Sequence, residues 1–131
     1  MGGARGALRF LIDSVILIDH FNGRPEATRC LARIGREAAL SVITRAEVLT
    51  GFEPSEAVAA MGLLDRFPTL AIDPPVADLA ARLRREQRWK MPDALQAALA
   101  QYHSLELVTR NRRDFPPDRH RFVKVPYVLP K

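Results

Sequence analysis

The chain of 131 residues has the length of one domain, long enough to bury about two-thirds of its unfolded surface without a disulfide or structural metal. Its single cysteine, Cys30, excludes an intrachain disulfide and a cysteine-rich zinc site and so favours a reducing cytoplasm. Because no apolar run reaches 18 residues and the glycine-rich residues 1–7 are too short for a signal peptide, we expect no membrane contact and disorder at residues 1–7.

Apolar runs and helix-start residues alternate along the chain. Short runs rich in strand formers predict strands at 10–12, 39–43, 70–72, 106–109 and 122–125. Apolar residues at helical spacing predict helices between these strands. The first helix ends near Phe21, and later helices start at Pro25, Thr44, Pro54, Pro74 and Pro92. This alternation predicts an α/β fold, a three-layer α/β/α sandwich with a mainly parallel central sheet.

Four acidic residues stand at or just beyond the ends of predicted strands, or in the first turn of a helix. Asp13 follows the first strand, Glu47 follows the second, and Asp114 follows the strand at 106–109, while Asp93 begins the helix after Pro92. Ligands bind at the carboxyl edge of open parallel sheets, because the loops that leave the strands form a crevice there. We therefore expect these carboxylates to meet at one edge of one sheet.

Each acid also has a purely structural explanation. Asp13 and Asp93 suit helix N-termini, Thr44 and Glu47 have the spacing of a capping box, and Asp114 suits a turn. Together, however, four converging carboxylates would repel one another unless a cation neutralised them. Carboxylate oxygens without a cysteine or histidine nearby favour Mg²⁺, or Mn²⁺, over zinc.

Basic residues concentrate near the end of the chain, within a formal net charge of +5. Residues 110–131 contain seven Lys or Arg and two Asp. A basic segment beside an acidic cluster suits a polyanion whose phosphates are bridged to the protein by metal. Arg110, Arg112 and Arg113 are the candidate phosphate contacts, and a solvated surface position explains each single arginine equally well.

In four motifs the chain resembles the PIN domains of the VapC toxin family. The motifs occur in the family's order and spacing and span nearly the whole chain: Leu11–Ser14 with Leu17–Asp19, Thr44–Glu47, Pro92–Leu95 and Val108–Phe115.

The resemblance implies a single PIN domain over residues 1–131. It implies a Mg²⁺-dependent endoribonuclease, the toxin of a type II toxin–antitoxin system, that hydrolyses RNA phosphodiester bonds with a metal-activated water. By the same resemblance, Asp13, Glu47, Asp93 and Asp114 would bind the metal and carry catalysis, supported by Ser14, Thr109 and Asn111. Whether Asn111 or Asp114 lies closer to the metal stays open. The implied partners are a VapB-like antitoxin and a second copy of the chain.

One position departs from the family. The family commonly has Asp-Thr-Asn where this chain has Asp13-Ser14-Val15, so the hydroxyl is kept but the amide is lost. The alternative is therefore a catalytically impaired PIN-like module that binds RNA without cutting it.

A candidate surface for the homodimer lies on the predicted helix 54–67. Apolar residues extend there beyond its core-facing stripe, namely Val58, Leu63 and Phe67.

Overall fold

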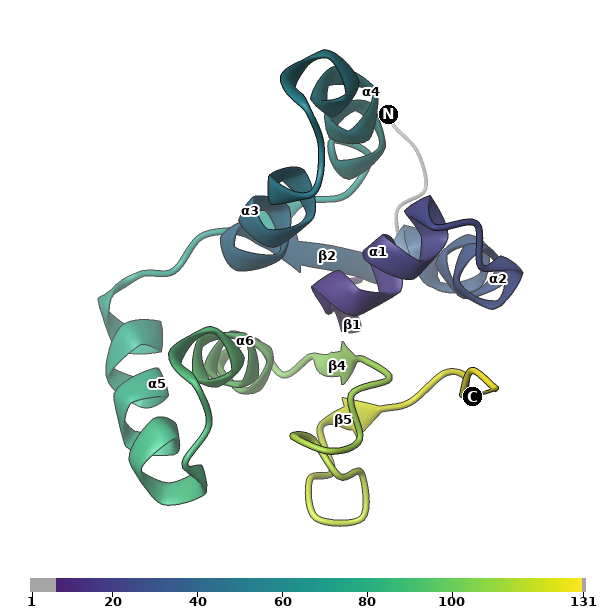
Figure 1. Cartoon of the computed structure of the whole chain (residues 1–131). Coiled ribbons are helices and arrows are strands. Elements are labelled where there is room, and N and C mark those ends of the chain that lie inside the picture. The colour runs from purple at the N-terminus through teal and green to yellow at the C-terminus, as the bar shows by residue number, and fades with distance from the viewer. Residues whose placement is uncertain (1–6, 131) are drawn as a thin grey trace.

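The structure, a computed structural model, describes residues 7–130, so the predicted disorder at 1–7 falls, apart from residue 7, outside the described residues. Within the described residues the central sheet has five strands in the order β3-β2-β1-β4-β5, and all four pairs of neighbouring strands are parallel (Figure 1). The strands are β1 (Phe10–Ile12), β2 (Ala38–Ser41), β3 (Thr69–Leu70), β4 (Glu106–Val108) and β5 (Val123–Lys124). Because β1 is the middle strand and Asp13 follows it directly, Asp13 lies at the carboxyl end of the middle strand.

Among residues 7–130, six α-helices and one short 3₁₀ helix make the connections between β1 and β4, and a loop leads from β4 to β5. Parallel strands need such crossovers, because a tight turn cannot return the chain to the same end of the sheet. The helices are α1 (Ser14–Phe21), α2 (Pro25–Ile34), η1 (Gly35–Glu37), α3 (Val42–Thr50), α4 (Pro54–Leu64), α5 (Pro74–Gln87) and α6 (Met91–Tyr102).

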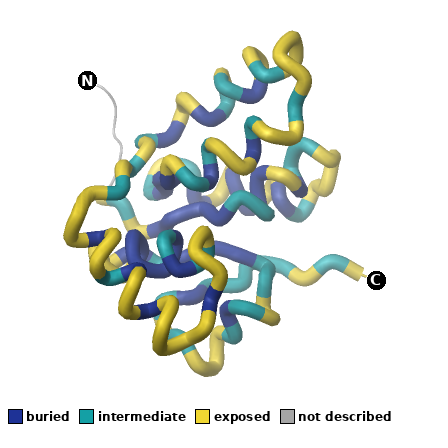
Figure 2. The backbone as a smooth tube through the Cα atoms, turned by 60° about the vertical axis from the view of Figure 1, so that its left-hand side comes forward, coloured by how far each residue is buried: buried dark blue, intermediate teal, exposed yellow. Residues whose placement is uncertain are grey.

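The two faces of the sheet carry separate hydrophobic cores. Side chains alternate between the faces along a strand, so Leu11 packs among residues of α5 and α6, whereas Phe10 and Ile12 pack among residues of α1 to α4. The central strands β1 and β2 are accordingly buried at every position (Figure 2). The predicted three-layer sandwich is therefore confirmed, and Cys30 lies buried in the second of these cores.

The predicted boundary between the second strand and the next helix is wrong. The strand ends at Ser41 and α3 begins at Val42, because the Ser41 side chain caps the helix by accepting a hydrogen bond from the Thr44 backbone N–H at 2.9 Å. A short apolar run such as Val42-Ile43 suits a buried strand and a helix equally well. Glu47 therefore does not complete a capping box. Other boundaries differ from the prediction by up to three residues.

The predicted apolar surface on the fourth helix is also wrong in part. Helix α4 ends at Leu64, and the turn that follows returns Phe67 to the core, where it is 8% exposed. Leu63 packs against the same core, so of the three predicted residues only Val58 is largely exposed, at 69%. Among residues 7–130, no helix is both long enough and apolar enough to cross a membrane.

Candidate functional site

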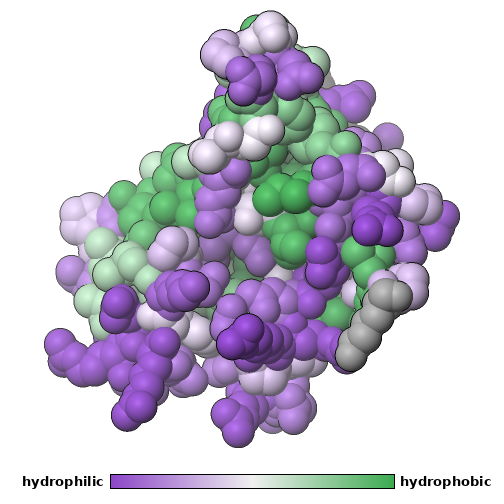
Figure 3. Space-filling view, viewed as in Figure 1, coloured by the Kyte–Doolittle hydropathy of each residue, from purple (hydrophilic) through white to green (hydrophobic). Residues whose placement is uncertain are grey.

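A pocket of about 470 Å³ opens where the central strands end. It brings together three of the four predicted acids, the two residues after Asp13, the predicted Asn111 and the three predicted arginines: Asp13, Ser14, Val15, Glu47, Asp93, Arg110, Asn111, Arg112 and Arg113. The pocket therefore lies at the edge of the sheet where the sequence predicts a site. Near it, the loop between β4 and β5 and helix α5 form the lower part of the molecule in Figure 1, where the visible surface is mostly hydrophilic (Figure 3).

Asp13 is held by three donors from three parts of the chain. Its Oδ1 accepts from the Ser14 N–H at 3.0 Å and from Gln96 Nε2 at 3.1 Å, and its Oδ2 accepts from Thr109 Oγ1 at 2.7 Å. Each carboxylate oxygen can accept two hydrogen bonds, so Oδ2 keeps one accepting position. The central carboxylate is thus fixed in orientation while it retains a lone pair for a further ligand.

Gln96 is the residue of this site that the sequence analysis missed. It lies on α6, is 1% exposed, and uses both amide hydrogens, one toward Asp13 and one toward Thr44 Oγ1 at 2.7 Å. Its Oε1 accepts from Ser41 Oγ at 2.5 Å. A glutamine three residues after Asp93, on a helix otherwise rich in alanine and leucine, was the available signal. Buried amides are kept only where their hydrogen bonds are satisfied.

Glu47 projects from α3 toward the start of α1. Its Oε1 accepts a hydrogen bond from Ser14 Oγ at 2.8 Å, across 33 positions of sequence, and its side chain is exposed. Ser14 therefore links two of the predicted acids, since its backbone N–H binds Asp13 and its hydroxyl binds Glu47.

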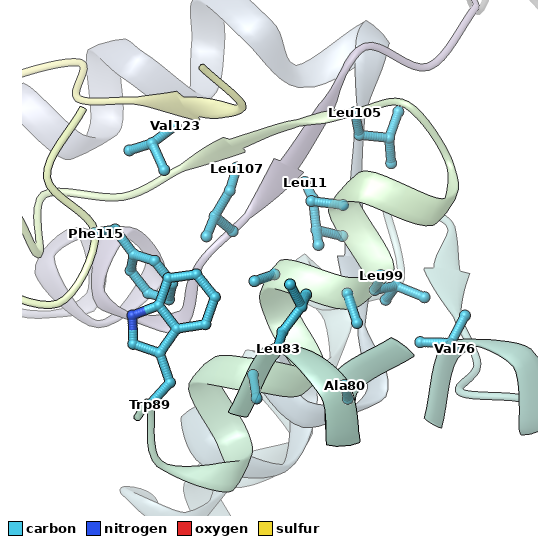
Figure 4. Close-up of a cluster of buried hydrophobic side chains, with 14 of the residues drawn as sticks. Leu11, Val76, Ala80, Leu83, Trp89, Leu99, Leu105, Leu107, Phe115 and Val123 are labelled. Carbon is cyan, nitrogen blue, oxygen red and sulfur yellow. The ribbon is translucent and has the colours of Figure 1, made fainter. Parts of the chain in front are cut away.

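Asn111 and Asp114 form one closed turn after β4. Asn111 Nδ2 donates to Asp114 Oδ2 at 2.9 Å, and the Asp114 N–H donates back to Asn111 Oδ1 at 3.2 Å. Trp89 holds this turn by two contacts. Its Nε1 donates a hydrogen bond to the Asp114 carbonyl, and its ring packs against Phe115 with ring centroids 5.1 Å apart (Figure 4). Asn111 lines the pocket, whereas Asp114 is not among the residues that line it.

The pKa of Asp93 reflects its burial and the negative charges of the other three acids. Its pKa is raised to about 6 by burial and by the negative charges of Asp114, Asp13 and Glu47, and Lys90 offsets this in part. The carboxylates thus repel one another in the absence of a cation.

The three arginines at the pocket differ in their surroundings. Arg112 and Arg113 are exposed at its rim. Arg110 instead donates from Nε and Nη2 to Asp19 on α1, at 2.5 and 2.9 Å. Burial opposes the ionisation of Asp19, but the hydrogen bonds from Arg110 and Tyr127 and the charge of Arg110 outweigh it and lower the pKa of this carboxyl.

The donor set fits a hard divalent cation. Within residues 7–130, no three side chains of His, Cys, Asp or Glu are grouped closely enough to form a ready-made metal site. Mg²⁺ does not need one, because it keeps several waters and binds proteins through one or two carboxylates. Asp13 and Asp93, with Glu47 and Asp114 nearby, meet that requirement, and a zinc site would require softer nitrogen or sulfur ligands.

The repulsion around Asp93 predicts a pH-dependent gain in stability when its charge is removed. In the folded, metal-free protein the pKa of its carboxyl is raised from the usual 3.8 to about 6, so the stability of the fold falls as pH rises between those values, and the cost persists above pH 6. With EDTA present, Asp93→Asn should raise the melting temperature at pH 7.5 by about 3 °C. At pH 4 the variant and parent should melt alike. A variant that melts lower than the parent at pH 7.5 would show that the carboxylates do not repel.

Comparisons with known proteins agree with this geometry. The family model described as "PIN domain" matches residues 10–116, and the chain belongs to that family. Two similar proteins from Mycobacterium tuberculosis carry the name ribonuclease. VapC10 is 33% identical and the match covers 92% of this chain and 94% of the relative, and VapC19 is 33% identical over 81% and 91%. A chain of a toxin–antitoxin complex from Klebsiella pneumoniae superposes with a TM-score of 0.85, at 37% identity over 95% of this chain and all of that one.

Proposed function

We propose that this protein is the toxin of a type II toxin–antitoxin system, an endoribonuclease that requires Mg²⁺ and hydrolyses RNA phosphodiester bonds with a metal-activated water. The observation that carries the proposal is the pocket at the carboxyl edge of the sheet, which Asp13, Glu47 and Asp93 line together with Arg112 and Arg113. Burial and the nearby charges of Asp114, Asp13 and Glu47 raise the pKa of Asp93, in keeping with this cluster. The ribonuclease names of the relatives, and the toxin–antitoxin complex that superposes on the chain, support the same activity.

Within this proposal Asp13 and Asp93 would hold the ion, and Glu47 and Asp114 would add their negative charge to the same cluster. When bound, the ion supplies a Lewis acid for the scissile phosphate and lowers the pKa of a water near it. Thr109, Gln96 and the Ser14 N–H keep the Asp13 carboxylate in one orientation, so little reorganisation is needed when the ion binds.

In the proposed complex, the exposed arginines position the RNA. Arg112 and Arg113 can meet phosphates on either side of the scissile bond, and such contacts carry no sequence information. Asn111 holds Asp114 in place through the two hydrogen bonds between them.

The second candidate is an impaired RNA-binding module, and Val15 is the observation that favours it. Its apolar side chain lines the pocket where the family commonly has an amide. The hydrogen bonds around Asp13 are nonetheless made without that amide, because Ser14, Gln96 and Thr109 supply all three donors. An active enzyme therefore explains the site better.

A toxin of this kind needs a partner. The proposed partner is a small VapB-like antitoxin, encoded beside the toxin, that offers an arginine to the carboxylates. We further propose a homodimer and a cytoplasmic location, where RNA is found.

The toxin role predicts a growth phenotype. Expression of the chain alone should arrest growth, and co-expression of the adjacent small open reading frame should restore it. Asp13→Asn expressed to the same level is the matched control and should be harmless. Normal growth with abundant soluble parent protein would contradict the toxin role.

A further inference from the structure

Asp19 is a buried carboxylate that belongs to no part of the proposed reaction. It lies in the second half of α1, is 3% exposed, and is not among the residues that line the acidic pocket. Its carboxylate accepts three hydrogen bonds. Arg110 supplies two, from Nε and Nη2, and Tyr127 Oη supplies the third at 2.8 Å. Two parallel bonds from one guanidinium fix both the distance and the plane of the pair.

Arg110, in contrast, does line the acidic pocket. Its chain neighbour Thr109 donates directly to Asp13 Oδ2, so the Arg110 backbone lies beside the central carboxylate. A guanidinium binds carboxylates bidentately and relieves their repulsion as a metal ion does. An unrestrained Arg110 would therefore be a competitor for the place of the metal.

The degree of exposure distinguishes Arg110 from its neighbours. Arg112 and Arg113 are exposed, so water solvates their charge. The Arg110 side chain is 35% exposed, against 5% for the Asp19 side chain. A charge that is partly withdrawn from water is stabilised by a nearby carboxylate, and the carboxylates near Arg110 are Asp19 and the acids of the pocket.

From this arrangement we infer that Asp19 is a positioning residue that holds Arg110 away from the acidic pocket and so keeps the pocket available to a divalent cation. This inference rests on the proposed metal-dependent function. Tyr127, from the segment after β5, fixes the Asp19 carboxylate from the other side. Arg110 then presents its guanidinium at the pocket wall without entering the acidic cluster.

The test is a calorimetric titration of the metal-free full chain with Mn²⁺, without RNA. Asp19→Asn should weaken Mn²⁺ binding about tenfold, which corresponds to about 1.4 kcal/mol, because Arg110 is released toward the carboxylates. Asp19→Asn with Arg110→Gln should restore the parent affinity, since the competitor is gone. Asp19→Asn with Arg112→Gln is the matched control and should stay weak. Tyr127→Phe, which disturbs the same cluster but leaves the ion pair in place, should bind Mn²⁺ as the parent does.

Each other outcome overturns the inference in a recognisable way. Equal affinity of Asp19→Asn and the parent, or equal weakness of Asp19→Asn with and without Arg110→Gln, would make Asp19 a structural residue only and leave the proposed function intact. If the parent protein binds no Mn²⁺, both the inference and the proposed function are contradicted.

A measurement on the parent alone keeps the inference testable if Asp19→Asn does not fold. The Arg110 Nε–H resonance should be protected from exchange at pH 7.5 and should keep its position when Mg²⁺ is added. Rapid exchange, or a large shift on adding Mg²⁺, would show that Arg110 visits the acidic cluster and would overturn the inference.

Discussion

Asp13→Asn should abolish RNA cleavage while the protein stays folded. The amide oxygen of asparagine can still accept hydrogen bonds from the Ser14 N–H and from Gln96 Nε2, and its amide nitrogen can donate to Thr109 Oγ1, but the negative charge that Mg²⁺ requires is lost. We expect a loss greater than the roughly 10- to 100-fold that follows removal of a residue that only orients a metal ligand. Initial cleavage rates at saturating Mg²⁺ measure it.

Asp78→Asn is the matched control for Asp13→Asn. Asp78 is an exposed acid on α5 outside the pocket, so its loss should leave the cleavage rate unchanged. Cleavage by Asp13→Asn at more than about a tenth of the parent rate would mean that the central carboxylate is not a metal ligand.

Gln96→Leu should damage both stability and cleavage. Leucine fills a similar volume but removes the partners of Ser41 Oγ, Thr44 Oγ1 and Asp13 Oδ1 in a buried place. With about 1 kcal/mol for each lost hydrogen bond, the free energy of unfolding should fall by about 3 kcal/mol. Cleavage should fall about 10- to 100-fold, because Asp13 loses one of the donors that orient it.

The control for Gln96→Leu lies on the same helix. Gln101 is exposed on α6, so Gln101→Leu should change the free energy of unfolding by less than about 0.5 kcal/mol. Chemical denaturation and cleavage assays on both variants separate the two positions. If Gln96→Leu were as stable and as active as Gln101→Leu, the hydrogen-bond network beneath Asp13 would have no functional role.

The sequence predicted what depends on local pattern. Strand and helix alternation indicated the parallel sheet and its two covering layers, because periodicity and helix-start residues act over a few positions. The four acids were recognisable because parallel strands present their carboxyl ends at one edge.

The missed features depend on partners that are distant in sequence. Gln96 contacts Ser41 and Asp13 across 55 and 83 positions, and Arg110 meets Asp19 across 91. No local pattern reports such pairs. The Ser41 cap was missed for another reason, since Val42 and Ile43 are strand formers by composition although the chain uses them to begin α3.

The proposed function requires that carboxylates at the carboxyl edge of the sheet bind a divalent cation on which RNA cleavage depends. Its most direct test is a circular RNA incubated with protein that has been stripped with EDTA, followed by addition of Mg²⁺ in steps. We predict no cleavage before addition and conversion of circles to linear RNA as Mg²⁺ is restored, since only an endonuclease can open a circle. Linear RNA formed in the presence of EDTA, or circles that persist at millimolar Mg²⁺, would contradict the claim.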